Sequence, residues 1–200
     1  MSGSLHNKSV QAVLKILVFC LCLVPFFVIL VNVWQNNLGP DPVKELSLLT
    51  GGWALRFLIL TLAITPARRI TGFSVLARYR RMIGLFTLYY ASWHFFIYLM
   101  FLLEFRWESI YEDVLERPYI TVGFSAYLIL AVLGITSPKV MVKKLGRNWI
   151  RLHRFIYLAA VFAIVHLVWI VRSDFRDALL YGFLVALLLG YRLLHVLRTR

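Results

Sequence analysis

Acidic residues are scarce in this 200-residue chain, and charges of either sign are few. Asp and Glu number 9 against 22 Lys and Arg. Charged residues make up 16% of the chain, where an ordinary soluble domain carries about 25%. A soluble fold of this composition would have too little polar surface, and a disordered chain would not be 61% hydrophobic. The composition therefore predicts an integral membrane protein.

Cysteines are almost absent, and glycine-rich phosphate-binding motifs are missing altogether. Cys20 and Cys22 lie two positions apart in an apolar run, which suits neither a disulfide scaffold nor a bridge between them. No GxGxxG or phosphate-loop motif occurs, and the polar connections are too short for a nucleotide-binding module. We expect one transmembrane domain over residues 1–200 with no soluble domain, so that any chemistry takes place among the helices or on a partner.

Long apolar runs are abundant. A helix that crosses a bilayer needs about 20 mostly apolar residues, and six runs are candidates. They cover residues 10–34, 52–66, 82–103, 119–136, 152–171 and 178–196. The second run is the shortest, with Arg56 about one turn inside it and Pro66 at its expected end. The prediction is an all-α integral membrane protein, a six-helix transmembrane bundle.

The charges are divided unevenly between the two sets of connections. The connections that follow odd-numbered runs hold all 9 acidic residues and five basic residues. The termini and the connections that follow even-numbered runs hold sixteen basic residues and no acid. The positive-inside rule then places both termini in the cytoplasm, with the acidic loops outside. The excess of positive charge is thus explained by orientation among membrane lipids and does not indicate a nucleic-acid partner.

Three histidines lie inside the runs, where an ionisable side chain is costly and is a functional candidate by default. His94 lies 13 residues beyond Arg81. His166 lies 15 residues beyond Arg151, so both imidazoles are expected about 20 Å from the cytoplasmic boundary on parallel helices. Two facing histidines at one depth suit the axial positions of a haem iron. Interhelical hydrogen bonds without a metal explain the pair equally well.

His153 lies near the cytoplasmic boundary, 13 residues before His166. It could ligate a second haem, but the third run offers Arg80 and Arg81 at that level instead of a histidine. Arginine binds a propionate or a flavin phosphate bidentately and does not ordinarily ligate iron. Positions 13 apart also point about 140° away from each other on an ideal helix. His153 therefore ligates differently or serves another cofactor.

The residues alone leave other functions open. Zinc is a weaker prediction because no Cys, Asp or Glu lies at the level of His94 and His166. A hydrolase is weaker still, since every carboxylate lies outside the runs. The alternatives to electron transfer are a transporter or channel whose histidines relay protons, and a non-redox membrane scaffold whose histidines are structural.

Short motifs follow one another in an order typical of one family. They are Leu38–Val43, Thr50–Leu55, Ala63–Pro66, Arg80–Leu85, Trp93–His94, Arg117–Tyr119, Leu145–Trp149, Leu152–Arg154 and Val165–His166. In this order the chain resembles the haem-binding membrane subunit of the periplasmic protein-methionine-sulfoxide reductase system (the MsrQ type), within the ferric-reductase-like transmembrane group. The resemblance extends from about residue 35 to residue 170, and more loosely over the rest.

This resemblance implies a function that composition does not. Members of the family bind b-type haem and are described as binding flavin mononucleotide (FMN). They pass electrons from membrane quinone to a periplasmic molybdopterin subunit, which reduces methionine sulfoxide in envelope proteins. The resemblance implies that His94, His153 and His166 are the ligands of one or two haems. The chain departs from the oxidases of the wider group, which carry two histidines on the third helix, because it has only His94 there.

Two further sets of residues are candidates for contacts. Arg147 and Arg151 could bind the flavin phosphate while Trp149 stacks on its ring, although a basic cytoplasmic loop is the simpler interpretation. The acidic outer loops could dock the partner subunit, although aromatic residues at an interface usually form only the membrane belt. The aromatic residues of these loops are Trp107, Tyr111 and Tyr119.

Overall fold

The computed structural model describes residues 8–171 and 174–198, and within them every side chain except those of residues 8, 102, 107–110 and 115. The elements are α1 (Lys8–Trp34), α2 (Pro42–Thr71), α3 (Leu76–Ile97), the π-helical segment η2 (Tyr98–Leu102), α4 (Trp107–Glu116), α5 (Pro118–Ile135), α6 (Lys139–Leu145), α7 (Arg147–His153), α8 (Ile156–Ile170) and α9 (Arg176–Arg198). No strand occurs among the described residues.

Six helical stretches of the described chain are long and apolar enough to cross a membrane, which confirms the predicted all-α bundle of six spans. They are Ser9–Trp34, Pro42–Thr71, Leu76–Phe101, Pro118–Ile135, Arg147–Ile170 and Arg176–Arg198. The fifth span contains both α7 and α8, with a turn at Arg154 and Phe155 between them.

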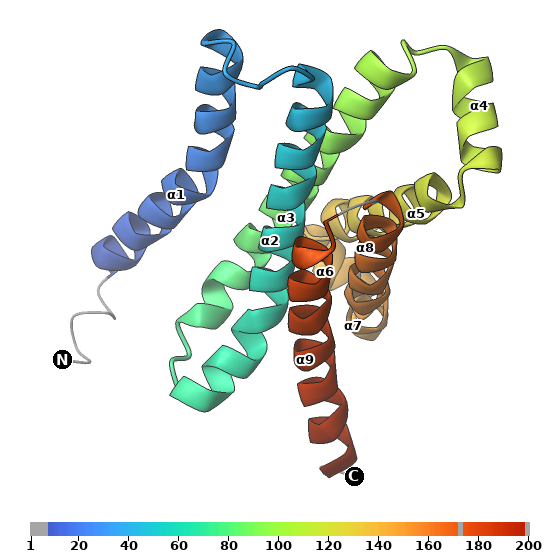
Figure 1. Ribbon diagram of the computed structural model, residues 1–200. Helices are drawn as coiled ribbons and strands as arrows, with labels where there is room; N and C mark the ends of the chain where they lie inside the picture. Colours follow the sequence, from blue (N-terminus) through green and yellow to red (C-terminus); the bar gives the residue numbers. More distant parts are fainter. Residues whose placement is uncertain (1–7, 172–173, 199–200) are drawn as a thin grey trace.

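The interior of the bundle is built from two antiparallel helix pairs. α2 packs along α3, and α5 packs along α8, while α9 lies against α2 and α8 (Figure 1). Leu58 and Leu62 of α2 and Ala159 and Ala160 of α8 are almost completely buried in the core that these helices share. Alanine at the contact allows the helix backbones to approach closely, which is how helices pack in lipid.

α1 lies at the edge of the bundle, against α2 and α3, and is bent along its length (Figure 1). Pro25 lies inside α1 and has no amide hydrogen to donate, which bends the helix at this point. The fully buried Tyr90 of α3 adds to the interruption, because its hydroxyl enters the hydrogen-bond ladder of α1 one residue later. The Tyr90 hydroxyl donates to the Cys22 carbonyl over 2.8 Å and accepts from the Phe26 amide over 3.0 Å. In a straight helix those two backbone groups would bond each other. Tyr90 therefore joins α1 to α3.

The predicted bounds of the second span were wrong. α2 extends well beyond both Gly52 and Pro66 in a helix of 30 residues. Its start is fixed by Asp41, whose carboxylate accepts from the Lys44 amide over 3.1 Å, and its end by Gly72 in the left-handed conformation. Arg56 accordingly lies about 21 Å from the first residue of α2, at 1.5 Å per residue, rather than about one turn inside the span.

Pro66 lies inside α2 because another helix satisfies the backbone group that it frees. Proline has no amide hydrogen, so the carbonyl four residues earlier, that of Leu62, loses its partner in the helix. The Arg192 side chain of α9 donates to this carbonyl over 2.7 Å. Within a membrane such a substitute partner is required, since no water is present to supply one.

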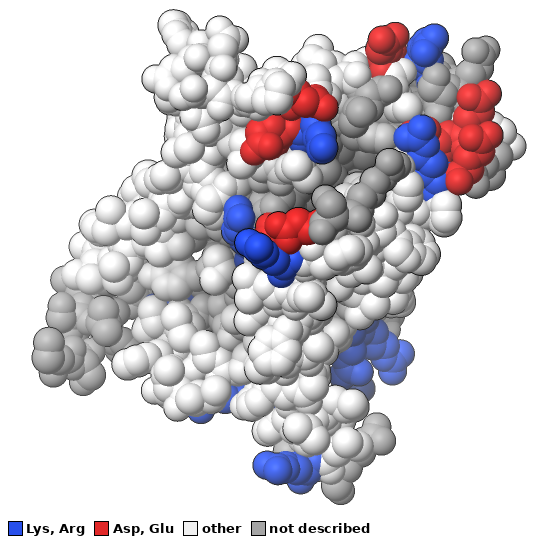
Figure 2. Space-filling model, viewed as in Figure 1, with Lys and Arg blue, Asp and Glu red and all other residues white. Residues whose placement is uncertain are grey.

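The charges are separated along the length of the bundle. On the face shown in Figure 2, Asp and Glu lie only in the upper half, and the lower end carries only Lys and Arg. The acids belong to the α1–α2 connection, to the first turn of α2, to the region around α4 and to the start of α9. α9 ends at the lower, basic end, whereas α1 runs from the left of the view at middle height to the upper end (Figure 1). The fold thus has one acidic and one basic end, as the sequence predicts.

Candidate functional site

His94 and His166 lie next to each other in the interior of the bundle. His94 is in the last turn of α3 and His166 is in the last turns of α8, which runs in the same direction. The centres of the two imidazole rings are 6.2 Å apart and the ring planes are inclined by 78°. The prediction that the two histidines share one depth is confirmed by this distance.

Each imidazole is fixed by a hydrogen bond to the backbone of a neighbouring helix. His94 Nδ1 lies 2.9 Å from the Ser47 carbonyl oxygen of α2, and His166 Nδ1 lies 2.7 Å from the Tyr119 carbonyl oxygen of α5. A carbonyl oxygen only accepts, so both Nδ1 atoms carry the hydrogen. Both Nε2 atoms are then left unprotonated, which is the state in which an imidazole ligates a metal.

Two glycines make room for the two rings. A Cβ atom on Gly51 would lie 3.0 Å from His94 Nδ1, and one on Gly123 would lie 2.6 Å from His166 Nδ1. Real Cβ contacts under 3.0 Å essentially never occur. Any larger residue at Gly123 would therefore push the His166 ring away from its carbonyl partner.

The two halves of the site repeat one arrangement at an offset of 72 residues. Each histidine follows the residue whose carbonyl it contacts by 47 positions. The matched pairs are Ser47 and Tyr119, Gly51 and Gly123, Pro66 and Pro138, and His94 and His166. The pair α2–α3 thus corresponds to the pair α5–α8, as in membrane proteins built from parallel repeats. Each half contributes one histidine to the interior.

The geometry fits two imidazoles that share one metal ion. A metal–nitrogen bond is about 2 Å long, and the centre of an imidazole lies about 1 Å from its ligating nitrogen, so two rings on opposite sides of one ion have centres about 6 Å apart. The observed 6.2 Å agrees with this value. Among the described residues no group of three or more His, Cys, Asp and Glu could hold an ion. A zinc centre is therefore not supported, whereas the two-ligand axial arrangement of haem iron is.

The histidine pair lies closer to the acidic end of the bundle than to the basic end. Ser47 is five residues after the start of α2, and Tyr119 is the second residue of α5. At this end Tyr98 donates to Asp113 of α4 over 2.9 Å, and Asp113 forms an ion pair with Arg117 at 3.2 Å. The Asp113 carboxylate raises the pKa of the Arg117 guanidinium. α4 is thereby attached to the end of the bundle where the candidate site lies.

His153 occupies a different environment from the other two histidines. Its Nε2 lies 3.1 Å from the Thr136 hydroxyl, and its ring stacks on Trp149 with 3.9 Å between the ring centres. The Trp149 indole also donates to the Thr136 carbonyl over 2.9 Å. In the 72-residue repeat the counterpart of His153 is Arg81. The repeat thus produces a pair of histidines only at the acidic end.

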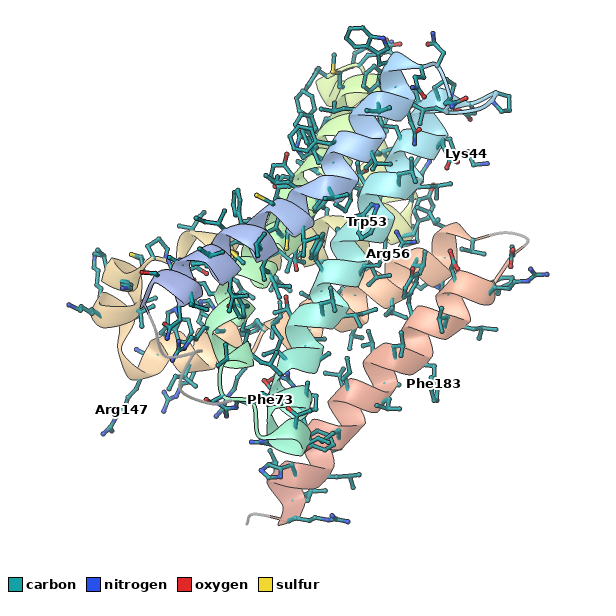
Figure 3. The ribbon with its side chains drawn as sticks, turned by 90° about the vertical axis from the view of Figure 1, so that its left-hand side faces the viewer. Lys44, Trp53, Arg56, Phe73, Arg147 and Phe183 are labelled. Carbon is teal, nitrogen blue, oxygen red and sulfur yellow. The ribbon has the colours of Figure 1, made fainter. Side chains whose placement is uncertain are left out.

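The four arginines predicted to bind a cofactor differ in exposure and in their contacts. Arg80 is half-buried and close enough to His153 to interact with it electrostatically. Arg81, Arg147 and Arg151 are exposed, and Arg147 points away from the bundle (Figure 3). Trp149, which was expected to stack on a flavin, is already occupied by His153 and Thr136. None of these contacts supports an FMN site, which stays a prediction.

The aromatic residues proposed for docking a partner also differ from one another. Tyr111 is 69% exposed on α4, whereas Tyr119 contributes its carbonyl to His166. The side chain of Trp107 lies outside the described residues. Of the three, Tyr111 alone is described as an exposed side chain on the acidic end.

Sequence reasoning missed the partners of the two histidines. The Ser47 and Tyr119 carbonyls and the two glycines lie on other helices, so local sequence around each histidine contains no sign of them. A signal was nevertheless present, because the glycines and the histidines recur at the same offset of 72 positions. Comparing the chain with itself would have paired each histidine with its glycine.

Comparisons with known proteins point in one direction. The family described as "Ferric reductase like transmembrane component" matches residues 50–164. The chain is 49% identical to the protein-methionine-sulfoxide reductase heme-binding subunit MsrQ of Xanthomonas euvesicatoria pv. vesicatoria (strain 85-10), over 84% of this chain and 79% of that protein. It is 40% identical to the protein-methionine-sulfoxide reductase heme-binding subunit MsrQ of Polaromonas naphthalenivorans (strain CJ2), over 89% of this chain and 83% of that protein. No solved structure matches the chain.

Proposed function

This chain belongs to the ferric-reductase-like transmembrane family, and within it to the MsrQ haem-binding subunits of protein-methionine-sulfoxide reductases, and from this we propose that it is a haem-binding electron-transfer subunit. The proposed ligands of the haem iron are His94 and His166. One observation carries the proposal: two interior imidazoles whose centres are 6.2 Å apart, each with its Nδ1 bonded to a carbonyl and its Nε2 free.

A b-type haem bound there would supply a one-electron carrier in the apolar part of the membrane. The residues of the chain do the rest. The Ser47 and Tyr119 carbonyls hold the two rings in one tautomer and orientation, which raises the basicity of each ligand. Gly51 and Gly123 keep the space beside the rings free. The surrounding apolar helices exclude water and thereby influence the reduction potential.

The position of the site supports the direction of transfer that we propose. If the acidic end faces the periplasm, as the positive-inside rule predicts, the histidine pair lies near the side on which the catalytic partner would dock. We propose that electrons come from membrane quinone and leave to a periplasmic molybdopterin-containing subunit that reduces methionine sulfoxide. In the described part of the chain both imidazoles bond backbone carbonyls and neither bonds an Asp or Glu, which favours electron transfer over a proton relay.

We propose one haem in each chain and assign no residue to FMN. A second haem on His153 would need another ligand. The counterpart of His153 in the repeat is Arg81, and Arg80 lies near it, but arginine does not ordinarily ligate iron. For FMN, Arg147 and Arg151 are exposed, and the ring of Trp149 between them stacks on His153. His153 and Arg80 remain a candidate site at the basic end for a different role.

Cofactor analysis of the purified protein tests the proposal. We expect haem with a reduced-minus-oxidised spectrum of the b type, at about one haem per chain. His94→Ala and His166→Ala should each remove or reshape that spectrum, because each change removes one axial ligand. His195→Ala is the matched control, since His195 lies near the basic end of α9, and its spectrum should equal that of the wild type.

Two outcomes would reject the proposal. The first is a well-folded wild-type protein that contains no haem when haem is supplied during expression. The second is an unchanged spectrum in both histidine variants. A transporter predicts flux in liposomes without a chromophore, and a structural scaffold predicts that His94→Ala leaves the activity of the partner reductase intact, so the three functions give different results.

A further inference from the structure

Arg56 is a charged residue in the middle of a transmembrane helix, and the site described above does not use it. It lies in α2, 12 residues before Arg68 at the basic end. Charged side chains within spans are costly and mark functional sites by default. The Arg56 side chain leaves α2 on the side that faces α9, just below Trp53 (Figure 3). There its Nε donates to the Tyr181 hydroxyl of α9 over 2.9 Å.

The guanidinium group is held rigidly by its neighbours. Its carbon atom lies 4.8 Å from the centre of the Trp53 ring and 6.0 Å from that of Tyr181, which places the cation over two aromatic rings. With Nε bonded to Tyr181, the orientation of the terminal nitrogens is fixed. An arginine that is fixed in this way is prepared to bind a planar anion through two parallel hydrogen bonds.

The guanidinium lies at the level of the histidine pair, although the α carbon of Arg56 is further toward the basic end. A Cβ atom on Gly52 would lie 3.6 Å from the terminal nitrogen Nη1 of Arg56, so the side chain extends back by one turn. Gly52 is adjacent to Gly51, which touches the His94 ring. The two consecutive glycines thus make room for two groups at one depth, the His94 imidazole and the Arg56 guanidinium.

The terminal nitrogens of Arg56 have no acceptor in the described part of the chain. Among the described residues Arg56 hydrogen-bonds to Tyr181 through Nε alone, and none of their ion pairs involves Arg56. A cation at this depth without a counter-charge is unfavourable, so an anion supplied from outside the chain would be bound strongly. Because Arg56 lies beside the histidine pair, the expected anion is a carboxylate of the ligand that the two histidines hold.

We propose that Arg56, positioned by Tyr181 and Trp53, binds a propionate carboxylate of the haem held by His94 and His166. The assignment rests on the proposed function. Haem carries two propionates on one edge, and a bidentate guanidinium–carboxylate pair both neutralises one of them and fixes the rotation of the ring about the histidine axis. The positive charge of Arg56 beside the haem stabilises the reduced form, which carries one more electron than the oxidised form, so the loss of Arg56 lowers the reduction potential.

The test compares haem with haem dimethyl ester, in which both propionates are esterified, on the apo form of the full-length protein in detergent. Esterification is expected to weaken binding to the wild type by ten- to hundred-fold more than it weakens binding to Arg56→Gln, because a hydrogen bond to a charged group is lost in the wild type alone. The midpoint potential of bound haem is expected to fall in Arg56→Gln. Arg192→Gln, a change of an α9 arginine that contacts Tyr157 and Leu62, is the matched control with wild-type ester sensitivity.

The outcomes separate this inference from the proposed function. If the wild type binds neither haem nor its ester, the proposed function fails. If the wild type binds haem through His94 and His166 but Arg56→Gln has the same ester sensitivity and potential as the wild type, the Arg56 assignment alone is overturned. Should Arg56→Gln fold poorly, Arg56→Lys and Tyr181→Phe replace it. Arg56→Lys keeps the charge but loses the planar guanidinium, and Tyr181→Phe keeps the guanidinium but loses the hydroxyl that orients it. Each should reduce the ester sensitivity less than Arg56→Gln does.

Discussion

At the scale of single residues, the candidate site depends on backbone groups and on missing side chains as much as on the two histidines. The imidazole of His166 bonds the Tyr119 carbonyl over 2.7 Å and lies against Gly123. A metal-ligating histidine is oriented by the group that accepts from its other nitrogen, and loss of that group typically costs ten- to hundred-fold in metal affinity. The glycine therefore acts on the ligand by keeping this bond in place.

Adding one methyl group at each glycine tests this dependence. Gly123→Ala places a Cβ atom 2.6 Å from His166 Nδ1, so the ring must move and haem content should fall several-fold. Gly51→Ala, at 3.0 Å from His94 Nδ1, should cause a smaller loss. Gly190→Ala is the control, since nothing lies within 4 Å and alanine favours a helix. Haem per chain is measured by absorption together with the thermal unfolding midpoint, and full haem content in Gly123→Ala would contradict the role of the glycine.

The depth of His94 and His166 could be predicted from the sequence, but their surroundings could not. Depth follows from counting residues beyond Arg81 and Arg151, since the rise of a helix is constant. The carbonyl that each ring contacts belongs to a helix 47 residues away, and that depends on which spans are neighbours. The Arg80 and Arg147 predictions had less support, because a basic cluster at a membrane boundary is also what orientation alone produces.

At the scale of elements, α2 contains two features that are unfavourable in a transmembrane helix, and contacts with α9 compensate for both. Pro66 leaves the Leu62 carbonyl unpaired, and Arg192 donates to it over 2.7 Å. Arg56 brings a charge into the span, and Tyr181 accepts one of its hydrogen bonds. The predicted second span stopped at Pro66 because proline ends most helices, and only the position of α9 reveals why this helix continues.

A double-mutant cycle on Pro66 and Arg192 measures this compensation. Arg192→Met should lower the free energy of unfolding by about 1–2 kcal/mol, because it leaves a buried carbonyl without a donor. In the Pro66→Ala background residue 66 supplies its own amide to Leu62, so the same change should cost less. Arg198→Met, at the exposed end of α9, is the control. Equal costs in the two backgrounds, measured by denaturant unfolding in detergent, would show that Arg192 stabilises the fold through other contacts.

At the scale of the whole molecule, a repeated helix pair and a separation of charge along the bundle together determine what the protein can do. The 72-residue repeat brings one histidine from each half to a common level, which places the ligand pair in the interior. The charge asymmetry decides which way that level faces (Figure 2). The repeat is imperfect at the basic end, where Arg81 corresponds to His153. The molecule therefore has a symmetric site only toward the acidic end.

The orientation of the bundle can be tested with thiol reagents that do not cross membranes. In a background with Cys20→Ala and Cys22→Ala, a cysteine replaces Asn37 in the α1–α2 connection or Ser74 in the α2–α3 connection. The positive-inside rule predicts that Asn37→Cys is labelled from the periplasm, whereas Ser74→Cys reacts only after the inner membrane is permeabilised. The reverse pattern would place His94 and His166 near the cytoplasm. Electrons would then have to cross most of the bilayer to reach a periplasmic partner, and one haem at this level would not be enough for the proposed transfer.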